Sequence, residues 1–335
     1  MAKTYIGIEI GNYRMKMAVC EEETVKRMVA VELPENTVRE GQIVSWEAMA
    51  DFIKETLKEQ HIPGKNAAVV LPEGLTYVLR VNMPAMTVDQ LKVNLPYEFH
   101  DYITDEKEKY FYDYAVVGME RDDKGTPKNM DLLAVAVRKA SMERYRNMMK
   151  RAGLKLVLAA PEIVAYENII RRYQELEGEE TECVPDYGVL NIGHTSVKLH
   201  IYKQGHYDVT CNIEPGLEAM TSIISDTTGA DRHIAELYKQ KNREDIWNHE
   251  DCVSLYNRIA VELMRVLNFY SFNHPDNTLE KVYYCGGGAM ITPLLDEISS
   301  IIEQELVGID TLFPAGSGER EDLLNGAAAA GITWQ

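Results

Sequence analysis

Two short glycine turns in the sequence carry polar residues of the kind that could bind a phosphate group. The first is Glu9-Ile10-Gly11-Asn12 and the second is Asn191-Ile192-Gly193-His194, and each lies between two apolar stretches. A glycine lets the main chain approach an anion closely, and its amide can donate to a phosphate oxygen. We therefore predict that both turns bind phosphate, with the residue two positions before each glycine facing a metal ion or its waters.

A third glycine turn, Gly286-Gly287-Gly288, follows the apolar stretch that begins at Lys281. These three residues leave a flat main-chain surface, against which we predict that an adenine ring lies. Taken singly, each of the three turns is best explained as a tight connection between two elements. Their joint order along the chain is what favours a nucleotide site.

The residues around the two hairpin turns repeat along the chain. Tyr5 corresponds to Tyr187, Gly11 to Gly193 and Lys16 to Lys198 at one constant offset. A hairpin used twice indicates a duplicated domain, with a cleft between the two copies.

The elements predicted around these hairpins belong to an α/β fold. In the first copy the apolar patterns predict a hairpin within residues 5–19, a strand over 25–34, a helix over Ser45–Gln60 with Ser45 as its N-cap, and a strand over Asn66–Pro72. In the second copy they predict strands over 188–191, 197–202 and 207–213, helices over 234–241 and 253–272, and a strand with its turn over 281–291. Each copy thus has the order strand, strand, strand, helix, strand (βββαβ).

A region with patterns of its own, Leu79–Arg151, lies between the two copies. It predicts a helix after a proline-ended strand, strands over 110–120 and 130–139, and a helix that stops at Gly153. We interpret it as an inserted α+β subdomain. A helix over Pro161–Leu176 and a polar linker over Glu177–Asp186 follow. The predicted division is therefore 1–78 with 152–180 for the first subdomain, 79–151 for the inserted one and 187–335 for the second lobe.

The inserted region contains a run of aromatic residues. Some of them must form its core, and an exposed few would suit the capture of a peptide, since tyrosine gives contact area at low entropic cost. The run consists of Tyr97, Phe99, Tyr102, Tyr110, Phe111, Tyr112 and Tyr114.

The composition excludes several classes of function. The 335 residues carry a net charge of −18 without a run of Lys or Arg, which argues against nucleic-acid binding and against direct attraction to anionic lipid. Five scattered cysteines without a CxxC pair are typical of reduced thiols in the cytosol. No stretch has the roughly 18 apolar residues that a membrane span needs. We expect a cytoplasmic protein that reaches a membrane only through a partner.

With these residues in view, the chain resembles the actin-like ATPases, a superfamily with a duplicated, ribonuclease-H-like, two-lobed fold. That superfamily has two phosphate loops followed by an adenosine loop, in the order found here, and a lysine seven positions after the first acidic residue, where this chain has Lys16. Its bacterial members often carry the helix pattern A-E-x-x-K, which matches Ala235–Lys239. Alone, that pentad is a weak signal.

Within the superfamily the chain resembles the PilM family of type IV pilus assembly proteins, over nearly its whole length. The matching stretches include IGIEIG, NAAVVLP, NMPAMTVDQLKVNLPYEFHDYI, AGLKLVLAAPEIVAYENI, LNIGHTSVKLHIY and VYYCGGGAM. The inserted region fits the extra subdomain that this family shares with the division protein FtsA.

The resemblance implies a set of site residues and ligands. It implies ATP and Mg²⁺ as cofactors, Glu9 as the residue facing the metal, and Glu9 and Glu162 as candidate catalytic carboxylates. The cofactor-binding residues would be Gly11, Asn12, Lys16, Asn191, Gly193, His194, Thr195, Glu236, Lys239, Gly286, Gly287 and Gly288. His194 on its own is better explained as a solvated loop residue.

The resemblance also implies partners on the cytoplasmic face of the membrane. The N-terminal tail of a PilN-like bitopic membrane protein would lie in a groove between the first subdomain and the inserted one. The protein would thereby connect the inner-membrane complex of a type IV pilus, or of a related type II secretion system, to the pilus motor ATPase.

The sequence departs from the family pattern at the acidic positions. The family usually has Asp in both phosphate loops and another near position 160, where this chain has Glu9, Asn191 and Ala160. Asn191 cannot supply a negative charge and is a poor base for positioning water. We therefore expect ATP hydrolysis to be slow or absent.

Two other functions of the same fold stay open from the sequence. An FtsA-like cytoskeletal ATPase would form filaments, although such chains usually end in an amphipathic membrane helix and this one ends in the Ala/Gly-rich stretch EDLLNGAAAAGITWQ. A small-molecule kinase would need a catalytic carboxylate near the acceptor, and Asn191 argues against it.

Overall fold

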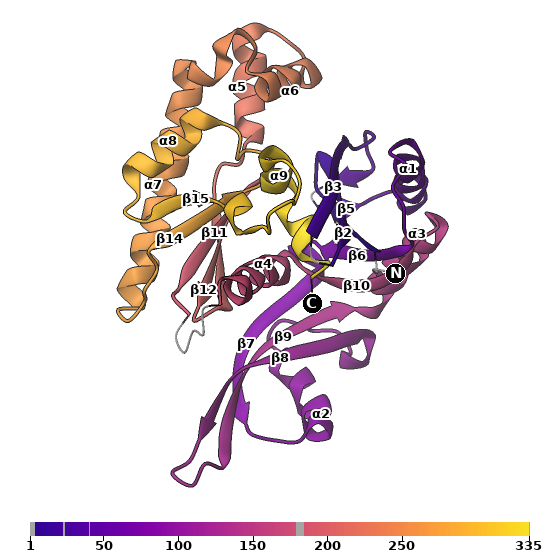
Figure 1. Ribbon diagram of the computed structural model, residues 1–335, viewed down its shortest axis with the longest axis vertical. Helices are drawn as coiled ribbons and strands as arrows, with labels where there is room; N and C mark the ends of the chain where they lie inside the picture. The colour runs from indigo at the N-terminus through magenta and orange to yellow at the C-terminus, as the bar shows by residue number, and fades with distance from the viewer. Residues whose placement is uncertain (1–3, 23, 40, 179–183, 335) are drawn as a thin grey trace.

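Two five-stranded sheets of the same topology form the two lobes of the molecule (Figure 1). The computed structural model describes residues 4–22, 24–39, 41–178 and 184–334. The strands of the first sheet run in the order β10-β6-β1-β2-β3 and those of the second in the order β13-β12-β11-β14-β15. In each sheet the two strands of the predicted hairpin pair antiparallel, and the strand after the helix, β6 or β14, pairs parallel to the first strand of the hairpin.

The first lobe follows the predicted βββαβ order. Its strands are β1 (Thr4–Ile10), β2 (Arg14–Glu21), β3 (Thr24–Glu32), β6 (Asn66–Leu71) and β10 (Lys155–Pro161), with the short pair β4 (Val38–Arg39) and β5 (Gln42–Ile43) and the helices α1 (Trp46–Glu59) and α3 (Lys139–Arg151). β6 is buried along almost its whole length because it lies between two other strands. Ser45 occupies the N-cap position of α1 as predicted, but its side chain makes no capping hydrogen bond.

The second lobe repeats the pattern with an additional helix. Its elements are β11 (Tyr187–Ile192), β12 (Val197–Lys203), β13 (His206–Ile213), α5 (Glu218–Thr228), α6 (Arg232–Lys241), α7 (Glu250–Asn273), β14 (Lys281–Cys285), α8 (Thr292–Ile301) and β15 (Glu305–Gly308). α5 was not predicted. It begins directly after the cis peptide bond between Glu214 and Pro215.

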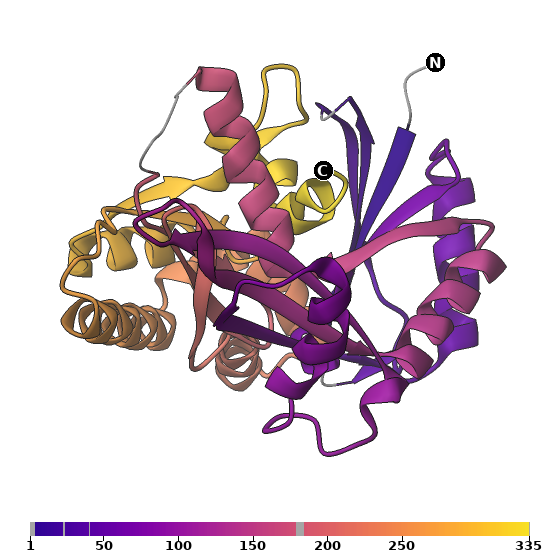
Figure 2. The same ribbon diagram turned by 90° about the horizontal axis from the view of Figure 1, so that it is seen from below.

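Two helices lie between the sheets of the two lobes: α4 (Glu162–Glu177) and α9 (Arg320–Gly331) (Figures 1 and 2). α9 packs against β1, β2 and β3 of the first lobe and against α4, although it follows the second lobe in sequence. Most of its second half, Ala327–Gly331, is buried. The Ala/Gly-rich C-terminal stretch is therefore a core helix shared by both lobes, because only small side chains allow it to approach the first sheet so closely.

The inserted subdomain is a three-stranded sheet covered by one helix. Its strands, in the order β7-β9-β8, are β7 (Thr76–Pro84), β9 (Pro127–Arg138) and β8 (Tyr110–Arg121), and its helix is α2 (Val88–Glu98). Its own core runs from Met83 to Ala136. The sequence-based division ends this subdomain at Arg151, but Tyr145, Met148 and Met149 of α3 belong to the core of the first lobe.

The described residues also form four short 3₁₀ helices: η1 (Glu73–Leu75), η2 (Lys107–Lys109), η3 (Arg243–Asn248) and η4 (Ile309–Leu312). Within the described ranges, no helix combines the length and apolar character that crossing a membrane requires. Cys20, Cys211, Cys252 and Cys285 are free thiols, whereas Cys183 and much of the predicted linker lie outside the described residues.

Candidate functional site

The first glycine turn closes the β1–β2 hairpin. The amide of Gly11 donates to the carbonyl of Arg14 at 3.0 Å. A Cβ atom at position 11 would lie 2.9 Å from that same carbonyl oxygen, so the tight turn favours glycine. Directly below the turn, Glu9 and Lys16 face each other across the two strands, and Lys16 Nζ lies 2.7 Å from Glu9 Oε1. The charged side chains are thus held at the base of the predicted phosphate loop.

The second turn has the same geometry. The amide of Gly193 donates to the carbonyl of Ser196 at 3.0 Å, and a Cβ at position 193 would lie 2.7 Å from that oxygen. Asn191 and Lys198 are paired across β11 and β12, as Glu9 and Lys16 are in the first lobe. The two hairpins are therefore structural copies, with an amide in place of the carboxylate in the second.

The two turns touch each other across the seam between the lobes. Asn12 Nδ2 donates to Thr195 Oγ1 at 2.8 Å. The rings of Tyr13 and His194 stack with their centroids 5.3 Å apart, and Arg14 donates to Gln240 of α6. The structure thus brings together the predicted residues Gly11, Asn12, Gly193, His194 and Thr195.

Glu162, the first residue of α4, lies at the centre of a charged cluster below the second turn. Its carboxylate accepts from Asn191 Nδ2 at 2.9 Å and from Lys198 Nζ at 3.0 Å, and His200 Nε2 lies 3.6 Å away. Lys198 also pairs with Glu73 at 2.9 Å. The carboxylate that position 191 lacks is therefore supplied to the same place by another element. We call Glu162, Asn191, Lys198, His200 and Glu73 the Glu162 cluster.

The electrostatics of this cluster keep Glu162 ionised. Burial alone would raise the pKa of Glu162, but the nearby His200 and Lys198, with hydrogen bonds from Lys198 and Asn191, lower it to about 2. Burial lowers the pKa of His200 in spite of the adjacent carboxylate, so the imidazole is neutral at neutral pH. Burial also opposes the charge on Lys198, but Glu162 and Glu73 together raise its pKa above the usual value.

The predicted residues of α6 lie on the second-lobe side of the seam. Glu236 and Lys239 form an ion pair of 2.6 Å that is almost completely buried. Lys239 Nζ also donates to Thr221 of α5 at 2.8 Å and lies 3.4 Å from His194 Nδ1. Burial, and then the charge of Lys239, lower the pKa of His194. His194 is therefore a half-buried, neutral contact between the second turn and α6 rather than a solvated loop residue.

The three glycines of the third turn have different surroundings. A Cβ at Gly286 would lie 2.5 Å from Asn191 Oδ1, and one at Gly288 would lie 2.4 Å from a methyl group of Ile192. Both glycines are buried, and the amide of Gly288 donates to the carbonyl of Ile192 at 2.9 Å. Only Gly287 is exposed. Two of the three glycines thus allow the turn to pack against the second glycine turn, and Gly287 is the one that a ligand could touch.

The donor set for Mg²⁺ is small. Glu9 provides one carboxylate, of which one oxygen is paired with Lys16. No group of three or more His, Cys, Asp or Glu side chains suited to a metal ion occurs in the part of the chain that the structure describes. Because Mg²⁺ often keeps several waters and binds through one or two carboxylates and substrate phosphates, Glu9 is compatible with such an ion if a nucleotide supplies the other ligands.

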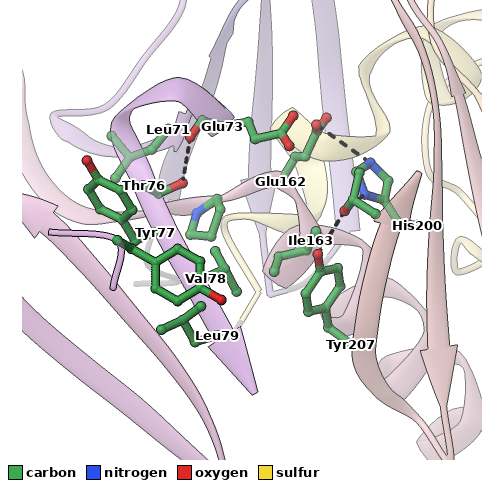
Figure 3. Close-up of a pocket in the computed structure, with 13 residues that line it drawn as sticks. Leu71, Glu73, Thr76, Tyr77, Val78, Leu79, Glu162, Ile163, His200 and Tyr207 are labelled. Atoms are coloured by element: carbon green, nitrogen blue, oxygen red, sulfur yellow. Dashed lines mark hydrogen bonds and ion pairs between the residues drawn. The ribbon is translucent and has the colours of Figure 1, made fainter. Parts of the chain in front are cut away.

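A cavity of about 220 Å³ is lined in part by residues of the Glu162 cluster (Figure 3). We call it the junction pocket because it has walls from the first lobe, the inserted subdomain and the second lobe. Its lining consists of Leu71, Glu73, Thr76, Tyr77, Val78, Leu79, Tyr102, Pro161, Glu162, Ile163, His200, Tyr207 and Thr210. Figure 3 shows the paired Glu162 and His200 side chains on one side and the β7 residues opposite them.

Three members of the Glu162 cluster are not among the site residues predicted from the sequence: Lys198, His200 and Glu73. Lys198 could have been recognised, because the repeat places it opposite Asn191 as Lys16 lies opposite Glu9. His200 and Glu73 give no such signal, since only tertiary packing brings them to Glu162. Ala160, at the end of β10, is paired with Val70 of β6 and carries no polar group toward the seam.

The sequence matches the family described as "Type IV pilus assembly protein PilM" over residues 7–313. This match covers most of the chain and includes all three glycine turns. A search of curated proteins finds no match.

Several solved structures have a similar fold. One, described as "PilM-PilN type IV pilus biogenesis complex", has a TM-score of 0.77 at 19% identity and covers 98% of this chain and 97% of that one. EutJ from Carboxydothermus hydrogenoformans has a TM-score of 0.60 at 16% identity, with 99% and 90% covered. MreB 5 of Spiroplasma citri, bound to AMPPNP, has a TM-score of 0.51 at 13% identity, with 99% and 96% covered. At these identities the likeness shows the actin-like fold alone. It is the match over residues 7–313 that shows the family: this chain belongs to the PilM family of type IV pilus assembly proteins.

Proposed function

We propose that this chain binds ATP between its two phosphate loops and acts as a cytoplasmic scaffold of the inner-membrane assembly complex of a type IV pilus or a related type II secretion system. The observation that carries the proposal is the convergence of two equivalent glycine turns, whose Asn12 and Thr195 side chains are 2.8 Å apart. One triphosphate could reach the loops of both lobes there. Lys16 would pair with a phosphate, and Gly287 with Glu236 would face the adenosine.

The proposed ATP binding is tested by removing the side chain of Lys16, the lysine of the first loop. We expect Lys16→Ala to weaken ATP binding at least about tenfold, because a hydrogen bond to a charged group contributes roughly 1.5–3 kcal/mol. Isothermal titration calorimetry with ATP and Mg²⁺ measures the change. Lys26→Ala is the matched control, since Lys26 is an exposed lysine on the neighbouring strand β3. Equal affinities for the two variants would contradict the assignment of the seam as the nucleotide site.

Hydrolysis of the bound ATP should be slow or absent. Mg²⁺, when bound, would neutralise part of the triphosphate charge, and Glu9 would hold its waters. Asn191 has no carboxylate to accept a proton from an attacking water, and Glu162 is already engaged by Asn191 and Lys198. A phosphate-release assay that gave several turnovers per second would contradict this part of the proposal.

We further propose that the junction pocket holds the N-terminal tail of a PilN-like bitopic membrane protein. The solved complex that this chain resembles pairs PilM with PilN. The pocket has walls from the first lobe and the inserted subdomain, the two parts that would form the groove, as well as from the second lobe, and Tyr102 of the aromatic run lines it. Its volume of about 220 Å³ and its apolar residues Val78, Leu79 and Ile163 suit one or two large apolar side chains of an extended segment. Membrane attachment would then come from the partner.

Filling the pocket should prevent the tail from binding. We expect Val78→Trp to weaken binding of a synthetic peptide with the tail sequence more than about tenfold, because the larger side chain occupies space that the peptide needs. Fluorescence anisotropy of the labelled peptide is the measurement. Val116→Trp is the control: it makes the same change on β8 of the same sheet, at a side chain that is 50% exposed and outside the pocket. A tail that bound both variants equally would have its site elsewhere.

A further inference from the structure

The Glu162 cluster connects the linings of two separate cavities. Glu162 and His200 line the junction pocket. Lys198 lines a second, more open cavity of about 600 Å³ beside the second phosphate loop, together with Thr195 and Ser196. Glu73 lines both. Two short ion pairs, Lys198–Glu162 at 3.0 Å and Lys198–Glu73 at 2.9 Å, join the two linings. A ligand in either cavity therefore touches one end of a continuous charged network.

The same network joins the two lobes. Glu162 and Glu73 directly follow or lie close behind β10 and β6 of the first sheet, whereas Asn191, Lys198 and His200 are on β11 and β12 of the second. The junction pocket also has walls from both lobes, because Leu71 of β6 and Pro161 of β10 line it together with Tyr207 and Thr210 of β13. Arg80 of the inserted subdomain adds another contact to the second lobe, 3.7 Å from Asp208. An occupant of the pocket must therefore bind both lobes at the relative position that these contacts define.

The polar atoms of the cluster make it sensitive to that occupant. His200 is 1% exposed, and its Nε2 atom has no hydrogen-bond partner within the distance of a true bond. Its Nδ1 atom is 2.8 Å from Thr210 Oγ1, a second residue of the pocket wall. On the opposite side, Asn191 holds Glu162 through a bond of 2.9 Å and approaches the third glycine turn through its Oδ1 atom. A displacement of His200 or Glu162 would therefore be transmitted to the proposed nucleotide site through Asn191.

We propose that the tail and the nucleotide bind with positive cooperativity, and that Glu162 is the residue that couples the two sites. This inference rests on the proposed function and goes beyond it, because two ligands could occupy the two sites independently. Each ligand fixes the relative position of the lobes, so the second one to bind loses less conformational freedom. By linkage, the factor by which the tail tightens ATP binding must equal the factor by which ATP tightens tail binding.

Calorimetry on the full chain tests this coupling. The probes are ATP with Mg²⁺ and a synthetic peptide of the PilN-like tail, each titrated alone and in the presence of a saturating amount of the other. In the wild type we expect each ligand to tighten the other at least about fivefold. In Glu162→Gln we expect this factor to fall below about twofold, whatever happens to the two individual Kd values. Glu175→Gln is the matched control, since it makes the same change at an exposed site on the same helix, and it should keep the wild-type factor.

The outcomes separate this inference from the proposed function. If both ligands bind the wild type but neither changes the other's Kd by more than about twofold, the coupling is overturned and the proposed function stands. A wild-type factor that persists in Glu162→Gln overturns the role of Glu162. Glu73→Gln, which changes a more exposed member of the same network, is expected to reduce the factor as well and gives a second measurement if Glu162→Gln does not fold. If neither ligand binds at all, the proposed function is overturned and the inference with it.

Discussion

Replacing Gly7 by alanine is expected to lower the free energy of unfolding by more than about 4 kcal/mol, a loss found only for severe packing or buried-charge defects. Gly7 lies on β1, where α9 crosses the first sheet. A Cβ atom there would lie 1.7 Å from the carbonyl oxygen of Ala329 and 2.9 Å from a side-chain atom of Thr333. The first of these is a main-chain atom in the last turn of α9, so the clash cannot be relieved by a side-chain rotation. β1 and α9 would have to separate.

Urea unfolding followed by circular dichroism measures this loss, with soluble yield as a second indicator. Gly318→Ala is the matched control, because a Cβ at position 318 meets no atom within 4 Å. We expect that control to remain within about 0.5 kcal/mol of the wild type. If Gly7→Ala were as stable as Gly318→Ala, α9 would not pack on the first sheet as described.

Replacing Asn191 by aspartate is expected to destabilise the protein by about 2–4 kcal/mol, even though it restores the residue that the family usually carries. Asn191 Nδ2 donates to Glu162 at 2.9 Å. An aspartate would put a second carboxylate in place of that donor, and two carboxylates at this distance cannot both stay ionised without strong repulsion. The measurement is again urea unfolding at neutral pH.

A double variant distinguishes this explanation from a general loss of packing. Glu162→Gln combined with Asn191→Asp exchanges the amide and the carboxylate, so one donor again meets one acceptor, and Lys198 remains close to a negative charge. We expect the double variant to recover most of the stability that Asn191→Asp loses, a coupling of about 2 kcal/mol in the double-mutant cycle. Additive losses would mean that Asn191 and Glu162 do not interact.

The sequence predicts the duplicated architecture because local patterns encode it. The two hairpins align at one constant offset, and the structure confirms both of them, with Glu9 opposite Lys16 and Asn191 opposite Lys198. The actin-like fold is confirmed as well. Hairpin turns are short-range features, so glycine spacing and apolar alternation are enough to predict them.

The sequence is less informative where residues meet over long distances. It marks Gly11 as the important glycine of IGIEIG, yet Gly7 has the closer main-chain contact, through a helix more than three hundred residues away. It assigns no structural role to Ala327–Ala330, whereas the structure buries these residues between the lobes. It presents Asn191 as the loss of a charge and Glu162 as a candidate carboxylate, but it gives no indication that Asn191 itself donates to Glu162.

For this protein, then, the sequence by itself determined the two lobes, their order of elements and the three glycine turns, because each depends on residues close together in the chain. The tertiary structure alone decided which side chains share a site: Asn12 with Thr195, Glu162 with Asn191, and the three walls of the junction pocket. These contacts depend on how α4 and α9 pack between two sheets, and the net balance of many weak long-range contacts leaves no periodic signal in the sequence.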